Sequence, residues 1–524
     1  MYHKKNLSFV LDHIPAVVSG LMLTAAFPDT GAYYLAFVAL VPLLVLIRAM
    51  TPQRAFYAGF VAGFIHYLTL IYWLVPTITI YGGLHPLLGI STLTLLCLYL
   101  ALYVGVFAFL MKRLDPSPVL TPLAGAFLWV GLEYIRTYAL TGFPWGVLGY
   151  SQDSNLTLVQ IADLTGVLGL SFLIVLCNGC LAQIYLYLGP GPGAGSRREI
   201  RILVVYTLVL MAAALAYGNF RVRAIDVLIL NAAKPKVSVI QGNIRQDLKW
   251  DTAFKEATIE KYGRLSLKAA GKHPELIIWP ETALPFYYGY NTVHSNLVDG
   301  YVRLAKTHFL IGSPAFEQGK ENPTFYNRVY LLTPLALVTG TYDKTHLVPF
   351  GEYVPLQAYL KFLGKITEQA GDFSAGERSF VPLAFKEHKT GVLICFEILF
   401  PNIARQFVKN GADILTTITN DAWFGHTSAA RQHFSIAVLR AVENRRSVVR
   451  AANTGISGVI DPAGRILEKT NLFVDAAITQ AVPALKDIFF YSRHGDLLGI
   501  TALVAICLWF MVKGIKNPFR RTQK

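Results

Sequence analysis

The sequence contains few charged residues and few cysteines. Only 15% of its 524 residues are Asp, Glu, Lys or Arg, whereas an average soluble domain has about 25%. This shortage disfavours a disordered chain, a coiled coil and an ordinary soluble enzyme. Five cysteines in a chain of this length also exclude a scaffold held together by disulfides.

Acidic residues are scarcer than basic ones, 32 against 47, which gives a formal net charge of +15. In a soluble protein such an excess would indicate nucleic-acid binding. Here the basic residues gather in short segments beside long apolar runs, so their placement matters more than their number. We therefore predict no nucleic-acid partner.

Long apolar runs dominate the first part of the chain and recur at its end. Runs of about 20 residues are long enough to cross a bilayer as helices. Eight such runs lie near residues 8–27, 31–47, 56–75, 84–111, 120–140, 164–188, 201–220 and 495–513. The sequence thus predicts a multi-span α-helical membrane domain of eight helices. A cleaved signal peptide is the alternative for the first run, but the second run follows so closely that a helical hairpin is favoured.

Basic residues predict the orientation of these helices. They occur at both ends of the chain and in alternate short loops: Lys4, Lys5, Arg48, Arg54, Lys112, Arg113, Arg197, Arg198, Arg201, Lys513, Lys516, Arg520, Arg521 and Lys524. By the positive-inside rule both termini are cytoplasmic. We expect a membrane domain with seven helices over 1–220, an extracytoplasmic domain over 221–490, and an eighth helix with a basic tail over 491–524.

Two pairs of reactive side chains fall inside the predicted membrane helices. Glu133 and Arg136 are three residues apart and share a helix face, where an ion pair can mark a functional site. We favour a structural pair that orients the following loop, Thr141–Gly146. Cys177 and Cys180 form a CxxC pair without a second pair of zinc ligands, so we interpret them as small packing residues.

The segment 221–490 has a different pattern, in which short apolar runs alternate with polar helical stretches. The runs predict strands at Val237–Gln241, Leu276–Trp279, Phe309–Gly312, Val329–Leu332, Val392–Cys395 and Ile414–Ile418. The stretches predict helices at Thr252–Ala270, Ile398–Asn410 and Ser428–Arg446. This alternation predicts one large α/β or layered α+β domain.

Cys395 is the only cysteine in this segment, and it ends an apolar run that a helix is expected to follow. Ligand sites favour the carboxyl edge of a sheet, and a helix N-terminus lowers the pKa of a thiol. The alternative is a buried apolar cysteine, which is common.

Other reactive residues follow strand-like runs in the same way. Glu281 ends the run that begins at Leu276, and Lys344 follows the strand-like run Val329–Val338, with Glu352 shortly beyond. A thiol nucleophile needs a base, and an acyl-transfer intermediate needs a cation or N–H donors at its oxyanion. Glu281 and Lys344 supply both functions for Cys395.

Histidines leave two alternatives open. His346 could take the place of Lys344, and a Cys–His hydrolase could pair Cys395 with His426 or His433. The spacing of these residues does not exclude either arrangement.

These motifs resemble those of the nitrilase superfamily, whose Glu, Lys and Cys residues occur in this order. The matching segments are WPETALPF with Glu281, YDKTHLVPFGEYVP with Lys344 and Glu352, and GVLICFE with Cys395. NDAWFG and RAANTGISGVIDPAGRI match as well. The apolar runs before and after this domain, together with TGFPWG and VIQGNIRQDLKW, resemble the membrane-embedded acyltransferase branch of the superfamily.

The resemblance implies an α/β nitrilase-like domain with an αββα sandwich on the periplasmic side of a bacterial inner membrane. It implies transfer of an acyl chain from a phospholipid donor to the N-terminal cysteine amine of a diacylglyceryl apolipoprotein acceptor. The reaction would pass through a thioester on cysteine. The resemblance implies no metal and no organic cofactor.

The resemblance also implies roles for individual residues. Glu281 would be the general base, Lys344 would hold the oxyanion, Cys395 would be the nucleophile, and Glu352 would pair with Lys344. The supporting assignments are less specific. Glu397 would support the site or cap the next helix, Trp250 would contact substrate or pack in the core, and Phe396 stands where the branch has tyrosine.

Two aromatic segments near the expected site, Phe286–Tyr290 and Tyr353–Leu363, could enter the membrane interface or pack as ordinary loops. Two rival functions also stay open. One is a membrane-tethered amidase that acts on a small soluble substrate, and the other is a transporter with an outside binding domain. A single span would be enough to anchor an amidase, so eight predicted spans disfavour the first function. The predicted spans carry few charged residues, which disfavours a transporter.

The distribution of basic residues gives a prediction about topology. A reporter enzyme fused after Tyr301 is expected to be active outside the cytoplasm, because the loops rich in Lys and Arg stay inside. The measurement is the activity of an export-dependent reporter at this position, with a fusion in the loop at residues 190–196 as the cytoplasmic control. A cytoplasmic result at Tyr301 would contradict the orientation.

Overall fold

The computed structural model describes residues 2–189, 195–247, 249–319, 323–353 and 373–516. The chain divides into two compact units. One comprises residues 1–72, 90–220 and 496–524, and the other comprises 73–89 and 221–495.

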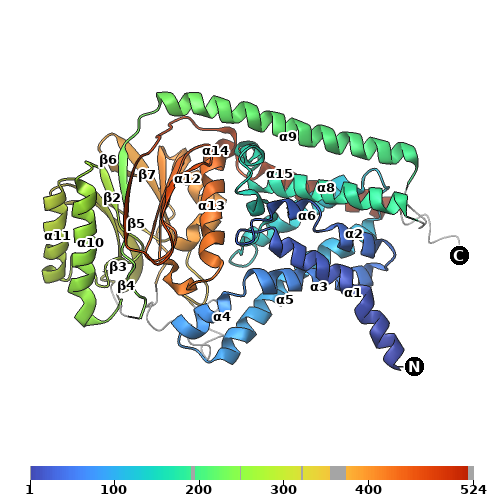
Figure 1. Ribbon diagram of the computed structural model, residues 1–524, viewed down its shortest axis with the longest axis horizontal. Helices are drawn as coiled ribbons and strands as arrows, with labels where there is room; N and C mark the ends of the chain where they lie inside the picture. Colours follow the sequence, from blue (N-terminus) through green and yellow to red (C-terminus); the bar gives the residue numbers. More distant parts are fainter. Residues whose placement is uncertain (1, 190–194, 248, 320–322, 354–372, 517–524) are drawn as a thin grey trace. The chain divides into compact units, whose positions relative to one another are not determined.

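The first unit is helical. Its longer helices are α1 (Tyr2–Ala25), α2 (Val41–Arg48), α3 (Pro52–Leu70), α5 (Pro86–Leu114), α6 (Thr121–Tyr138), α8 (Val167–Leu188), α9 (Arg197–Asn231) and α15 (Leu497–Lys516). The short helix α7 (Ala162–Thr165) precedes α8. Helix α6 packs against α8 and α15, and α1 packs against α3 (Figure 1).

Small residues let these helices approach closely. A Cβ atom on Gly20 of α1 would lie 2.5 Å from the Ala62 carbonyl oxygen of α3. A Cβ atom on Gly59 would likewise lie 2.5 Å from the Val104 carbonyl oxygen of α5. Close backbone contact between small residues is how helices associate in lipid, where neither partner gains from leaving water.

The helices support a membrane part, but not all eight predicted runs qualify as spans. Among the described residues three helices, α5, α8 and α9, are long and apolar enough, and a fourth is added if α3 and Leu74–Tyr81 count as one. The run at 31–47 breaks into a 3-10 turn, Tyr33–Phe37, and the eight-residue α2. Pro42 starts α2 afresh because it lacks the N–H that a continuing helix requires.

The Glu133–Arg136 pair orients the loop that follows α6, as the structural interpretation predicted. The Leu148 N–H donates to Glu133 Oε1 at 2.7 Å, and Arg136 donates to the Trp145 carbonyl at 3.1 Å. Arg136 also donates to the Tyr67 hydroxyl of α3. Both charged side chains therefore fix loop backbone.

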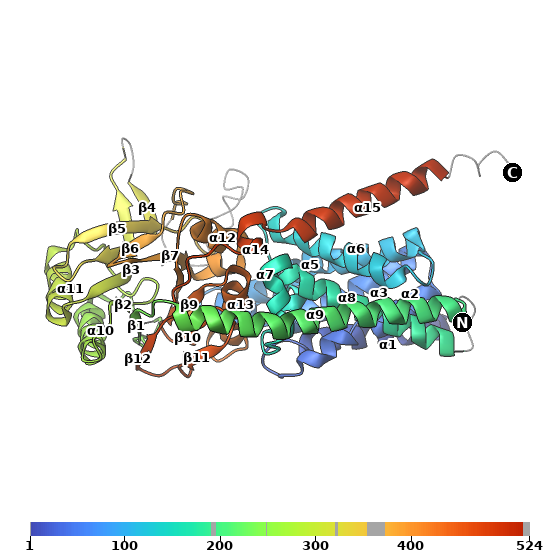
Figure 2. The same cartoon turned by 90° about the horizontal axis from the view of Figure 1, so that it is seen from above.

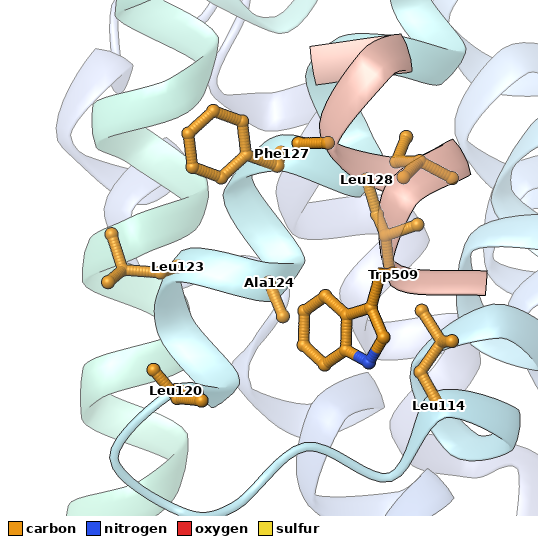
Figure 3. A pocket seen from close by; sticks show the side chains of 9 residues that line it. Leu114, Leu120, Leu123, Ala124, Phe127, Leu128 and Trp509 are labelled. Carbon is orange, nitrogen blue, oxygen red and sulfur yellow. The ribbon is translucent and has the colours of Figure 1, made fainter. Parts of the chain in front are cut away.

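An apolar cavity of about 180 Å³ lies in this unit, between α6 and α15 near the end of α5. Figure 3 shows Phe127 and Leu128 of α6 beside Trp509 of α15, with Leu114 at the end of α5. Its lining side chains carry no acid, base or nucleophile. The cavity is therefore not a candidate catalytic centre.

The second unit is an αββα sandwich of two six-stranded sheets. The first sheet has the order β12-β1-β2-β3-β4-β5, with β1 (Lys236–Gln241), β2 (Leu276–Ile278), β3 (His308–Glu317), β4 (Thr324–Leu332), β5 (Val338–Asp343) and β12 (Ala476–Ala481). The second has the order β11-β10-β9-β8-β7-β6, with β6 (Leu383–Phe385), β7 (His388–Ile394), β8 (Ile414–Thr419), β9 (Ser447–Ala452), β10 (Gly458–Ile460) and β11 (Ile466–Lys469).

Helices cover the outer face of each sheet. Helices α10 (Lys255–Ala270) and α11 (Thr292–Ala305) lie on the first sheet, and α12 (Pro401–Lys409) and α13 (Ala429–Asn444) lie on the second (Figure 1). Figure 2 shows the same layers from above. Strands β1 to β3 are parallel, as are β7 to β9. Each sheet therefore gathers the carboxyl ends of three parallel strands at one edge.

The strands form because their apolar runs are buried on both faces, as is typical of parallel strands beneath helices. Every residue of β2 and β8 is buried. Trp279, just after β2, stacks on Tyr262 with a 5.0 Å centroid separation and meets Phe309 edge-on at 5.9 Å. Its indole N–H donates to Ser266 of α10 at 2.8 Å, which satisfies the polar atom within the core.

The predicted strands and helices of this unit are confirmed. The strand-like run Val329–Val338 is the exception, because it crosses a hairpin: β4 ends at Leu332 and β5 begins at Val338. Lys344 therefore follows β5, an edge strand of the first sheet. Helix α11 and several short strands were not predicted.

Residues 73–89 form part of this unit although apolar helices flank them in the sequence. They include the single-turn α4 (Leu74–Pro76) and a π-helical turn, Thr77–Tyr81. The Trp73 indole meets Phe424 edge-on at 5.0 Å and donates to the Gln432 side chain at 3.3 Å. The segment thus packs on the loop and helix that follow β8.

The packing of Gly312 in β3 against the turn after β2 gives a prediction about stability. A Cβ atom on Gly312 would lie 2.5 Å from the Pro280 carbonyl oxygen and 2.8 Å from the Thr282 nitrogen. Because backbone has to move, we expect Gly312→Ala to lower the free energy of unfolding by about 1–3 kcal/mol. Thermal unfolding of the purified protein measures the change. Gly300→Ala is the matched control, because a Cβ atom at this position of α11 meets nothing within 4 Å. Equal unfolding temperatures for both variants would contradict the prediction.

Candidate active site

Three predicted residues meet at the carboxyl edges of the two sheets. Glu281 follows β2, Lys344 follows β5, and Cys395 follows β7 of the other sheet. The Lys344 ammonium lies 3.5 Å from Glu281 Oε1, and both side chains are buried. Charges on Glu281 and Lys344 both act on the Cys395 thiol. The structure therefore brings a nucleophile, a carboxylate and a cation together.

Cys395 occupies a sharp turn. Its φ is 53°, in the left-handed region that few residues other than glycine adopt. The strand ends at Ile394 and a 3-10 helix, Cys395–Leu399, begins at once. Strained turns of this kind present nucleophiles at the end of a strand.

The resting thiol needs a base. Burial raises the pKa of the Cys395 thiol, and the Glu281 carboxylate raises it further. Lys344 and a hydrogen bond from Thr419 oppose this but do not reverse it. The thiol is therefore protonated at neutral pH, and the adjacent Glu281 is placed to remove its proton.

The Lys344 ammonium stays charged in spite of its surroundings. Burial lowers its pKa, but the Glu352 and Glu281 carboxylates outweigh burial and raise the pKa above the ordinary value. The shorter contact is to Glu352 Oε1, at 2.9 Å. A permanently charged ammonium beside the thiol is suited to an oxyanion.

Asn327 of β4 joins the two carboxylates, and sequence analysis missed it. Its side-chain nitrogen donates to Glu281 Oε1 at 2.8 Å and to Glu352 Oε1 at 3.1 Å. The Val348 N–H holds the other Glu352 oxygen at 2.8 Å. Glu352 is thus fixed beside Lys344, as predicted.

The other oxygen of Glu281 points to a different neighbour. Glu281 Oε2 accepts a hydrogen bond from the Asn420 backbone N–H at 2.9 Å. Asn420 opens the NDAWFG motif, so the sequence match signalled this segment without showing that its backbone contacts the carboxylate. The two oxygens of Glu281 consequently face separate sets of groups.

Glu397 both caps the turn and supports the site. Its Oε2 accepts from the Ile394 N–H at 2.8 Å, at the start of the 3-10 helix. Its Oε1 accepts from the Thr345 N–H at 2.7 Å and from the Tyr342 hydroxyl at 2.8 Å. Burial raises the pKa of Glu397, while these donors oppose the rise. The carboxyl therefore ties the Cys395 turn to the backbone next to Lys344.

His433 contacts the backbone of the nucleophile, Cys395. Its Nε2 lies 3.3 Å from the Cys395 carbonyl oxygen, and its Nδ1 lies 3.1 Å from Asp421. Arg450 donates to the same carboxylate at 2.7 Å. Burial raises the pKa of Asp421, but Arg450 and His433 outweigh it and lower the pKa. This histidine thus contacts Cys395 backbone, which disfavours the Cys–His pairing.

The remaining histidines have other surroundings. The His426 ring stacks on Phe473 with a centroid separation of 3.9 Å. The ring centroids of His346 and Phe400 are 3.7 Å apart, and the His346 backbone N–H donates to Glu397. Phe396 is buried beside both rings, with its ring centroid 5.8 Å from that of His346 and 5.3 Å from that of Phe400. This part of the site is a packed aromatic wall.

Lys249 is a second cation that sequence analysis missed. Its buried ammonium donates to the Thr282 hydroxyl at 3.1 Å and to the Glu281 carbonyl at 3.4 Å. Burial lowers the pKa of Lys249 to about 8, although Glu281 opposes the shift. Trp250 beside it is half-buried, and its contact with substrate stays a prediction.

The aromatic segment Phe286–Tyr290 is partly packed. Phe286 and Tyr288 are buried, and the Tyr288 hydroxyl donates to Asp299 at 2.6 Å. Tyr290 is more exposed and stacks on Phe316 at 4.1 Å. Most of the other segment, Tyr353–Leu363, lies outside the described residues. In the part of the chain that the structure describes, His, Cys, Asp and Glu side chains form no group of three suited to a metal ion.

Comparisons with known proteins cover both units. Residues 19–180 match the model for the apolipoprotein N-acyltransferase N-terminal domain, and 236–484 match that for carbon–nitrogen hydrolases. The chain is 42% identical over 511 residues to the apolipoprotein N-acyltransferase of Geobacter metallireducens, covering 97% of this chain and 96% of the relative. It is 32% identical over 528 residues to that of Gloeobacter violaceus, covering 98% and 95%.

Among solved structures, the chain matches a mutant of the amidase from Nesterenkonia sp. AN1. The TM-score is 0.38 at 17% identity, and the match covers 50% of this chain and 94% of the amidase.

The lowered pKa of Lys249 gives a prediction about pH and stability. Between about pH 8 and 10 the unfolded chain keeps a proton that the folded site has released, so stability rises with pH. From pH 7 to 10 we expect wild type to gain about 2 kcal/mol relative to Lys249→Met. Denaturant unfolding at both pH values measures the difference. Lys268→Met, at an exposed position of α10, is the control and changes stability equally at both pH values. A constant gap between wild type and Lys249→Met would contradict the prediction.

Proposed function

This chain belongs to the apolipoprotein N-acyltransferase family, and from that premise we propose that it acts through a thioester on Cys395. The enzyme transfers an acyl chain to the N-terminal cysteine amine of an apolipoprotein. We propose a membrane phospholipid as donor and a diacylglyceryl apolipoprotein as acceptor. The observation that carries the mechanism is the placement of buried Glu281 and buried Lys344 beside the half-buried Cys395.

The first half-reaction forms the thioester. Glu281 takes the Cys395 proton, and the thiolate attacks the ester carbonyl carbon of the phospholipid. The carbonyl oxygen becomes an oxyanion, which Lys344 stabilises. The C–O bond then breaks, and the proton on Glu281 passes to the leaving oxygen, so a lysophospholipid departs.

The second half-reaction transfers the acyl group. The neutral α-amine attacks the thioester carbon, and Lys344 again holds the oxyanion. Glu281 takes a proton from the attacking nitrogen, the C–S bond breaks, and the proton returns to the thiolate. The products are an amide and the free Cys395 thiol.

The surroundings of Glu281 support Oε2 as the oxygen that handles protons. Oε1 faces Lys344 and Asn327, whereas Oε2 accepts one hydrogen bond among the described residues, from Asn420. The less occupied oxygen is the stronger candidate to accept a proton. Trp250 follows Lys249 on the loop after β1, and we propose that its side chain contacts the substrate.

The membrane arrangement is also part of the proposal. We propose eight membrane-crossing segments, with both termini in the cytoplasm and residues 221–490 on the periplasmic side of a bacterial inner membrane. The basic residues of the alternate loops support this orientation. Three or four described helices meet the length and hydropathy of a span on their own.

A membrane-tethered amidase acting on a soluble substrate is disfavoured. The family model for the N-terminal domain matches residues 19–180, a region that an amidase with a simple anchor does not need. The relatives match over nearly the whole chain, membrane helices included. The same full-length match disfavours a transporter.

Lys344→Arg tests the proposed oxyanion role. The ammonium lies in a tight buried site between Glu281 and Glu352, where a planar guanidinium cannot occupy the same point. We expect thioester formation to slow by roughly a hundred- to thousandfold, as when an oxyanion donor is lost. Intact-mass analysis of the enzyme, timed after mixing with phospholipid vesicles, measures the acyl group on Cys395.

Two matched variants complete this experiment. Lys386→Arg changes a half-exposed lysine of the same domain and leaves the rate within about twofold. Cys395→Ala carries no acyl group at all, whereas Cys507→Ala acylates normally. An acylated Cys395→Ala enzyme would disprove the nucleophile, and a normal rate for Lys344→Arg would disprove the oxyanion role.

A further inference from the structure

The side-chain amide of Gln246 is buried at the edge of the candidate active site. Only 6% of its surface is exposed, and its nitrogen Nε2 has no hydrogen-bond partner among the described residues. Buried donors without partners are rare and costly in folded proteins. A ligand that supplies an acceptor atom is one explanation for such a donor.

A relay of amides fixes the orientation of Gln246. The Ile244 backbone N–H donates to Asn453 Oδ1 at 2.9 Å, so the Asn453 nitrogen is the atom that donates to Asn420 Oδ1, at 3.0 Å. The Asn420 nitrogen then donates to Gln246 Oε1 at 2.7 Å. Because a backbone N–H can only donate, each amide in the relay has one consistent orientation. Nε2 of Gln246 is therefore the unpaired atom, and it is a donor.

The relay also places Gln246 on one side of the general base. Asn420, which binds Gln246 through its side chain, donates to Glu281 Oε2 through its backbone at 2.9 Å. Lys344 and Asn327 face the other oxygen of Glu281. Gln246 consequently lies on the side of Glu281 that is proposed to take the proton of the attacking amine.

The same loop carries further contacts to the base. Lys249 donates to the Glu281 carbonyl and to Thr282, and half-buried Trp250 is its neighbour. The loop after β1 is thereby fastened to the Glu281 turn at two points, one through Asn420 and one through Lys249. A donor on such a loop is held in place and needs no rearrangement to meet a substrate.

We infer that Gln246 Nε2 donates a hydrogen bond to the carbonyl oxygen of the acceptor's N-terminal cysteine residue. This inference rests on the proposed function, in which the amine of that residue loses its proton to Glu281 Oε2. The carbonyl oxygen is three bonds from the amine nitrogen, so an amine at Glu281 Oε2 brings this oxygen to the side of Glu281 on which Asn420 and Gln246 lie. Gln246 is thus a binding residue that distinguishes an N-terminal peptide residue from a simple amine.

The experiment compares two acceptors in the second half-reaction. One is a short S-diacylglyceryl-cysteinyl peptide, and the other is S-diacylglyceryl-cysteamine, which keeps the amine and lipid but lacks the carbonyl. The kcat/KM ratio of peptide to cysteamine is measured for wild type, Gln246→Met and Gln246→Glu. Comparing ratios between enzymes cancels the different intrinsic reactivities of the two amines.

We expect the ratio to fall roughly tenfold in both Gln246 variants, the size of one good hydrogen bond to a substrate. Gln246→Glu is informative because it keeps an acceptor for Asn420 while it removes the donor; the negative charge that it adds is met by both amine acceptors, so the ratio isolates the missing donor. Gln480→Met, which removes a β12 amide that donates to Glu468 of β11, is the control and leaves the ratio at the wild-type value.

Each other outcome overturns the inference. An unchanged ratio with slower reactions of both acceptors would make Gln246 a structural support of Asn420. If one Gln246 variant fails to fold, the other variant decides. If neither variant folds, Gln246 is a structural residue and the inference is overturned. Thioester formation is recorded separately in each enzyme. Failure of wild type to form it would refute the proposed function itself, whereas normal thioester with an unchanged ratio would refute only the role of Gln246.

Discussion

A fully buried ammonium is the constraint on which the rest of the site depends. Lys344 is 1% exposed, and an unpaired cation at such depth would be too costly to keep. Glu352 and Glu281 stabilise it, and Asn327 links both carboxylates. The same pairing fixes the base beside the nucleophile. The contacts that neutralise the charge of Lys344 are therefore the same contacts that hold Glu281 beside Cys395.

Because three of these groups lie on loops at sheet edges, other buried contacts hold the loops together. Glu397 connects the strained turn at Cys395 to the backbone after Lys344. On the opposite side His433 and Asp421 support the Cys395 carbonyl. A nucleophile in a left-handed conformation persists only where its surroundings determine it this strongly. The buried polar residues behind the site thus maintain its geometry.

Sequence analysis predicted the residues whose chemistry is distinctive and whose position follows a strand. Cys395, Glu281 and Lys344 each met both conditions, and the structure places them together. Asn327 lies inside a strand, and Gln246 follows one but has no distinctive chemistry. Amides are common, and the value of both residues here comes from contacts across the fold. Periodicity identified the parallel strands β1, β2, β3, β7 and β8, but it missed β9 and the hairpin before Lys344. Nor could it show that residues 73–89 belong with the second unit, because their apolar composition matches that of the helices around them.

The placement of residues 73–89 separates two meanings of the word domain. A fragment that starts at residue 221 contains all the strands of the sandwich, yet it lacks Trp73, which covers Phe424 and bonds Gln432. In such a fragment the surface of Phe424 that Trp73 covers would be exposed. Phe424 lies on the same loop as Asp421, and Asp421 contacts His433, which in turn contacts the Cys395 carbonyl. The sandwich is therefore not a module that can be excised or exchanged by cutting the chain once. A soluble version has to bring the distant segment with it, for instance as a grafted peptide joined to either end of the fragment.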